Sequence, residues 1–138
     1  MEEGKPKPEI DTSIGSRDRT KERPPNCFGR AFFLTGMTSD ERCVIVNNDG
    51  TIEGGGNIED LPLLGEPQIG CLAFIRSRLD RAIEHVGVVT QLAPLLMTDR
   101  NNMDGPVRED VDINHLLVNY PRGPHIVEYR LPIKGKFL

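Results

Sequence analysis

The chain has 138 residues, of which 37% are hydrophobic, so it can form one domain with a modest core and is too apolar to be wholly disordered. Its 17 basic and 21 acidic side chains give a net charge of −4, which argues against a nucleic-acid-binding protein. No apolar stretch approaches the roughly 18 residues of a membrane helix, and the first residues are too polar for a signal peptide.

The cysteines indicate the redox environment. There are three, widely spaced and without a Cys-x-x-Cys pair, which disfavours a disulfide framework or a zinc site. We therefore expect reduced thiols, a cytoplasmic protein, and neither a metal nor another cofactor.

The N-terminal segment differs from the remainder of the chain. Residues 1–25 contain 12 charged side chains and four prolines, with Ile10 and Ile14 as apolar content. Such a segment buries too little surface to offset the entropy lost on ordering. We expect a flexible arm over residues 1–23, followed by a single domain over residues 24–138.

The domain is predicted to begin with a buried helix. Asn26 is a good N-cap residue, and the apolar run from Cys27 to Thr35 forms about two and a half turns that end at Gly36. The next 30 or so residues read as turns around a short strand at Cys43–Val46. The triple glycine at Gly54–Gly56 lacks a phosphate-loop pattern and indicates a flexible loop beside a cleft.

The second half of the chain is predicted to form strands. Residues 69–76, 85–90 and 95–100 are close enough in sequence for an antiparallel meander, and residues 126–131 form a last strand. Val111–Leu117 fits a short helix or irregular structure. The fold class predicted from these elements is α+β, with one leading helix and an antiparallel sheet.

Cys27 is the strongest candidate for covalent chemistry. A thiol in the first turn of a helix feels the positive end of the helix dipole, which favours the thiolate, and its own backbone N–H can stabilise an oxyanion. The alternative is a small apolar residue in a buried helix. Cys43 and Cys71 lie in apolar runs and are expected to be ordinary core residues.

His85 is the candidate base. It begins a strand in which Gly87 allows close approach of a neighbouring group, and a cysteine at a helix start with a downstream histidine is the minimum for thiolate–imidazolium catalysis. Asp99 is placed to orient the imidazole if the hairpin register sets it beside His85. Thr98 is one register step away and stays an alternative.

The order of three short motifs resembles the NlpC-type cysteine hydrolases. These are Asn26-Cys27-Phe28-Gly29, then residues 70–75 (Gly-Cys-Leu-Ala-Phe-Ile), then residues 84–89 (Glu-His-Val-Gly-Val-Val). The resemblance covers roughly residues 24–105. It implies a papain-like fold with a nucleophile helix packed on a small antiparallel sheet, and Cys27, His85 and Asp99 as catalytic residues. Asn26, Phe28 and Gly55 are the candidates for oxyanion and substrate binding.

The leading hypothesis is a thiol peptidase or amidase that cleaves a peptide or related acyl bond through an acyl-enzyme on Cys27. A catalytically silent binding module of the same fold is the first alternative, and a thiol acyltransferase is the second. A discriminating observation is whether a third polar group lies within hydrogen-bond reach of His85.

Overall fold

A computed structural model of the chain describes residues 23–101, 105–119 and 124–137. The predicted arm, residues 1–23, lies almost entirely outside this part. The elements in chain order are α1 (Cys27–Leu34), η2 (Ile58–Asp60), β1 (Leu63–Leu64), β2 (Leu72–Ser77), β3 (Ile83–Gln91), β4 (Leu96–Arg100), β5 (Val107–Asp112), α2 (Ile113–Asn119) and β6 (His125–Arg130).

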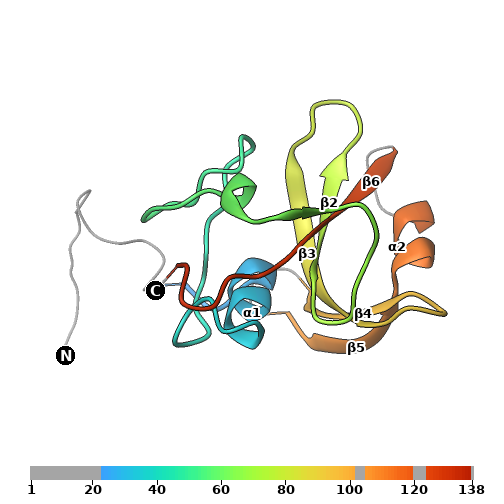
Figure 1. Cartoon of the computed structure of the whole chain (residues 1–138), viewed down its shortest axis with the longest axis horizontal. Coiled ribbons are helices and arrows are strands. Elements are labelled where there is room, and N and C mark those ends of the chain that lie inside the picture. Colours follow the sequence, from blue (N-terminus) through green and yellow to red (C-terminus); the bar gives the residue numbers. More distant parts are fainter. Residues whose placement is uncertain (1–22, 102–104, 120–123, 138) are drawn as a thin grey trace.

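The strands form a six-stranded sheet in the order β1-β6-β2-β3-β4-β5, with antiparallel neighbours throughout (Figure 1). The predicted meander is confirmed as β2, β3 and β4. β6 lies between β1 and β2, where it pairs with the full length of β2 from Leu72↔Arg130 to Ser77↔His125. All six residues of β2 are buried, because this strand lies inside the sheet and both of its faces are covered.

Apolar side chains cover the sheet on both faces. One cluster joins Phe28 and Phe32 of α1 to Leu72, Phe74 and other residues of β2 and β3. A second cluster joins Ile113 of α2 to Cys71, which directly precedes β2, and to the strand residues Ala73, Val89 and Met97. Alternate residues of β2 enter different clusters, as the two-residue period of a strand requires. The helices α1 and α2 are therefore short and pack on a larger sheet.

The fold-class prediction was wrong. We expected an α+β papain-like fold of the NlpC type, organised by a nucleophile helix on a small sheet. Within the described residues, the structure is mainly a six-stranded antiparallel sheet with two short α-helices, of eight and seven residues. The sheet is larger than expected because Leu63–Leu64 and Val107–Asp112, for which the sequence pattern gave no strand, form its two edges. The helical part is correspondingly small.

The prediction of the leading helix is confirmed. α1 ends at Leu34 with Thr35 as C-cap, and Gly36 adopts a φ of +77°, which glycine tolerates best. The C-terminal tail then lies along this end of the helix, since Gly135 N–H donates to the Gly36 carbonyl at 2.8 Å. The prediction of a strand at Cys43–Val46 was wrong, because this segment forms only an isolated bridge from Val46 to Ile52.

Candidate functional site

Asn26 fixes the start of α1 and with it the position of Cys27. Its Oδ1 accepts hydrogen bonds from the backbone N–H of Gly29 at 2.9 Å and of Val44 at 3.1 Å, and its Nδ2 donates to the Val44 carbonyl at 2.7 Å. The cap thus ties the first turn of α1 to the segment around Val44. Cys27 is the first helical residue and is 6% exposed.

Gly29 allows the same turn to lie against the backbone of residue 42. A Cβ on Gly29 would be 1.5 Å from the Arg42 carbonyl oxygen, so no larger residue fits without moving the backbone. Cys27 therefore lies between two fixed points, the Asn26–Val44 hydrogen bonds and the Gly29–Arg42 contact. Together they restrict movement of the first turn of α1.

His85 and Asp99 form a buried pair. Nε2 of His85 lies 2.6 Å from Oδ2 of Asp99, and the two residues are 4% and 1% exposed. Gly87 allows β4 to approach β3 closely, since a Cβ there would be 2.3 Å from Sδ of Met97. The strands β3 and β4 therefore hold the imidazole and the carboxylate together in the hairpin that the sequence predicted.

The geometry assigns the two ring nitrogens of His85. An ionised carboxylate can only accept hydrogen bonds, so Nε2 carries a proton and donates a hydrogen bond to Asp99. His85 also hydrogen-bonds Cys27, and Nδ1 is the nitrogen left for the sulfur. The structure therefore brings the three predicted catalytic residues together, with the imidazole between the thiol and the carboxylate.

The imidazole is held in its protonated form. Burial by itself lowers the pKa of His85, but the hydrogen bonds with Asp99 and Cys27 and the negative charges of both groups outweigh it and raise the pKa to about 9. At neutral pH His85 is accordingly an imidazolium, hydrogen-bonded to the Asp99 carboxylate and to the Cys27 side chain. An imidazolium beside a thiol is the arrangement that thiolate–imidazolium chemistry requires.

Asp99 has a second partner, Arg108 of β5. Nε of Arg108 donates to Oδ1 at 2.9 Å, and Nη2 donates to Oδ2 at 2.7 Å. Burial raises the pKa of Asp99, yet the hydrogen bonds and charges of His85 and Arg108 more than offset this and hold the pKa below its ordinary value. Asp99 is therefore ionised at all pH values near neutrality.

The alternative orienting residue, Thr98, has a different contact. Its hydroxyl donates to the Arg108 carbonyl oxygen at 2.9 Å. Asp99, rather than Thr98, is the residue of this pair that hydrogen-bonds His85. The other two histidines lie elsewhere, with His125 bonded to Glu84 at 2.9 Å and His115 exposed on α2.

The three residues predicted for oxyanion and substrate binding have different surroundings. The side chain of Asn26 is engaged in capping α1, as described above. Phe28 is buried, with its ring 6.4 Å from that of Phe32. No carbonyl within α1 can accept from the first-turn amides of Cys27 and Phe28, so these backbone N–H groups are the donors best suited to an oxyanion.

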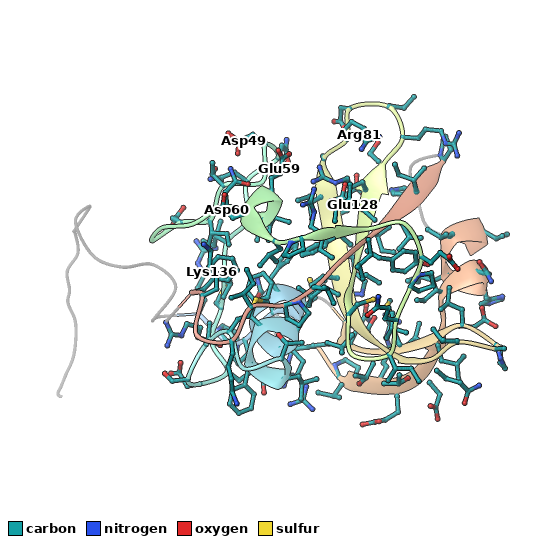
Figure 2. All side chains as sticks on the ribbon, viewed as in Figure 1. Asp49, Glu59, Asp60, Arg81, Glu128 and Lys136 are labelled. Carbon is teal, nitrogen blue, oxygen red and sulfur yellow. The ribbon has the colours of Figure 1, made fainter. Side chains whose placement is uncertain are left out.

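Gly55 lines a cavity of about 390 Å³ that also touches Cys43 and Val44, the segment bound to Asn26. Opposite charges line it as well, including Asp60 and Lys136, which Figure 2 shows on the flank of the molecule away from α2. Gly54, Gly55 and Gly56 all have φ between +100° and +125°, so the loop needs glycine for its backbone conformation.

Two charged residues near the site were not predicted from the sequence. Arg108 was not identified because the polar segment Val107–Asp112 was not expected to be a strand. Glu41 was also missed: its carboxylate bonds Arg30 of α1 at 3.1 Å and Arg100 of β4 at 2.7 Å. A partly buried ion-pair network therefore joins α1 to the strand that carries Asp99.

Two features are absent from the part of the chain that the structure describes. No cluster of three or more metal-ligating side chains occurs within residues 23–101, 105–119 and 124–137. In the same residues, every helix is too short or too polar to cross a bilayer. The three cysteines are buried and have free thiols.

No family model, curated protein or solved structure matches this chain.

Proposed function

We propose that this protein is a thiol hydrolase that cleaves an amide, peptide or related acyl bond. The observation that carries the proposal is the buried imidazole of His85, hydrogen-bonded to Asp99 and to a cysteine at the start of a helix. The motif order that resembles NlpC-type cysteine hydrolases supports the same chemistry, although the fold class implied by that resemblance is not the observed one. We propose no cofactor, since this chemistry requires none.

In the first step Sγ of Cys27 attacks the carbonyl carbon of the substrate. The amides of Cys27 and Phe28 stabilise the oxyanion that forms. The C–N bond then breaks, and Nδ1 of His85 gives its proton to the leaving amine, which leaves a thioester on Cys27.

In the second step water resolves the thioester. The neutral imidazole of His85 takes a proton from water, the hydroxide attacks the thioester carbon, and the C–S bond breaks. The acid leaves, and Cys27 returns to a thiolate beside an imidazolium. Asp99 stays ionised throughout and orients the ring.

The cavity beside the Cys43–Val44 segment is where we place the remainder of the substrate. Its lining combines the apolar side chains of Val44 and Phe137 with the charges of Asp60 and Lys136. A short peptide, with apolar and charged groups close together, fits this lining better than a long hydrocarbon chain.

The proposal is tested with an alkynyl iodoacetamide probe and a pooled library of dipeptidyl aminocoumarin amides. We expect the probe to label Cys27 more than tenfold faster than Cys71, because burial raises the pKa of the Cys71 thiol. Release of aminocoumarin is expected from the parent and from the matched control Cys71→Ala. It should be lost in Cys27→Ala and in His85→Ala.

The result that would overturn the proposal is equal labelling of Cys27 and Cys71 in the folded protein, or turnover that survives in Cys27→Ala. The near-complete burial of Cys27 favours one second candidate, a binding module without catalysis. That function would show as saturable peptide binding, measured by calorimetry, with no turnover in any variant.

A further inference from the structure

We propose that Arg108 is a positioning residue of this site, which holds the Asp99 carboxylate ionised and turned toward His85. This inference rests on the proposed function and extends it to a fourth residue. Arg108 acts through Asp99 and has no part in the bond-making steps.

The geometry of the contact carries the proposal. Arg108 binds Asp99 through two parallel hydrogen bonds, of 2.9 Å and 2.7 Å, one to each carboxylate oxygen. Such a fork fixes the plane of the carboxylate as well as its position. Oδ2 also accepts from His85, so the direction in which it points is set jointly by the imidazole and the guanidinium.

Burial explains why Asp99 needs this partner. The Asp99 side chain has no exposed surface, whereas Arg108 keeps 34% of its side chain exposed. A buried carboxylate with only a histidine partner would be much harder to keep charged, because burial favours its neutral form. Arg108 supplies a permanent positive charge from the edge strand of the sheet.

A β-bulge brings Arg108, rather than an acidic residue, opposite Asp99. The register of β4 and β5 is Met97↔Val111 at one end and Asp99↔Arg108 at the other, a shift of one residue between them. Without that shift Glu109 would lie opposite Asp99, two like charges facing each other. Asp110, within the bulge, has a φ of +56°, a conformation that Asp tolerates better than most residues.

Several other charged groups of the described residues lie on the elements around the imidazole. Cys27 of α1 and Asp99 of β4 contact His85 directly. Glu84, its neighbour on β3, is bonded to His125 of β6, and Arg100 of β4 is bonded to Glu41. Arg108 is therefore the cation that acts on the His85–Asp99 pair from β5.

The test measures the rate of Cys27 alkylation by iodoacetamide from pH 4 to pH 9, in the full-length parent and in Arg108→Met, Arg108→Lys and Arg100→Met. Methionine keeps most of the apolar stem and removes the charge. Without Arg108, Asp99 takes up a proton at higher pH and releases the imidazole. We expect the acid limb of the Arg108→Met profile to move to higher pH, with alkylation at pH 6 slowed by roughly 10- to 100-fold.

Arg100→Met is the control for a purely structural role. It breaks the ion pair to Glu41 on the same strand as Asp99, so it should lower the melting temperature and leave the acid limb unmoved. Arg108→Lys should recover part of the parental profile, because lysine restores the charge without the two-pronged contact.

Two outcomes separate this inference from the proposed function. If Cys27 of the parent has no enhanced reactivity at any pH, the proposed function fails. If the parent is reactive and folded Arg108→Met shows the parental acid limb, the proposed function stands and the role of Arg108 is refuted. The melting temperature of each variant verifies that it is folded.

Discussion

Replacement of Asp99 by asparagine tests the centre of the site with almost no change in volume. Asp99 accepts three hydrogen bonds, one from His85 and two from Arg108. An asparagine can accept on its oxygen only, so its NH₂ group must face at least one of these donors. Each hydrogen bond to a charged group contributes about 1.5–3 kcal/mol, and the variant loses at least one of them together with the negative charge.

The magnitude follows from the pKa of His85. Its rise from 6.5 to about 9 corresponds to about 3–4 kcal/mol of preference for the imidazolium, at about 1.4 kcal/mol per pKa unit. The hydrogen bond with Asp99 is the largest of the effects that raise this pKa, ahead of the contributions of Cys27. In Asp99→Asn we therefore expect the pKa of His85 to fall by on the order of one unit or more. Turnover should fall by roughly 10²- to 10⁴-fold, as when other orienting carboxylates are replaced.

The assay is an NMR titration of the imidazole ring protons of His85. Its resonance should titrate near pH 9 in the parent and well below that in Asp99→Asn. A His85 midpoint that is the same in both proteins would refute the reasoning, because Asp99 would then have no influence on the charge of the ring. A folded variant that turns over at the parental rate would refute it as well.

Three further predictions concern stability. Gly29→Ala should lower the free energy of unfolding by about 1–3 kcal/mol or more, measured in urea, since its Cβ would overlap the Arg42 carbonyl; a neutral result would mean that α1 can move away from this segment. Glu41→Gln should cost about 1–3 kcal/mol by weakening two arginine contacts between α1 and β4, and unchanged stability would show that this network is dispensable. Stability should also depend on pH. His85, with its raised pKa, contributes fully below about pH 6.5 and loses its contribution as the pH rises through 9, whereas Asp99, with its lowered pKa, loses its contribution as the pH falls below 3.8. Urea unfolding should therefore give a maximum between about pH 4 and 6.5, and a steady rise in stability up to pH 9 would contradict the charge assignment of the pair.

The sequence predicted correctly those elements that are determined by a few neighbouring residues. Asparagine is favoured at a helix N-cap, where Asn26 lies, and glycine is favoured just after a helix end, where Gly36 lies. The meander of β2, β3 and β4 follows from short connections between apolar runs, and it brought His85 and Asp99 into one hairpin. The pairing of these two side chains was therefore predictable, although their catalytic role stays a prediction.

The fold class was not predictable in the same way, because it depends on strands that pair over long distances. β6 joins β2 across about 50 residues of sequence, and β1 is only two residues long. β5 reads as Val-Arg-Glu-Asp-Val-Asp, a composition typical of a loop, and it forms a strand at the edge of the sheet, where charged side chains reach solvent. Periodicity gives no sign of such a strand.

The same edge strand explains why the candidate site was only partly predictable. Whether Asp99 faces Arg108 or Glu109 depends on one extra residue in a β-bulge. The pattern of apolar residues in β5 gives no sign of this bulge. Adjacent residues on β4 also face opposite sides of the sheet, and accordingly Asp99 binds Arg108 whereas Arg100 binds Glu41. β4 thus contributes to two separate ion-pair networks, one around the imidazole of His85 and one that joins β4 to α1. The roles proposed for Cys27 and His85 follow from local sequence signals, whereas the pairing of Asp99 with Arg108 depends on the register of β4 and β5.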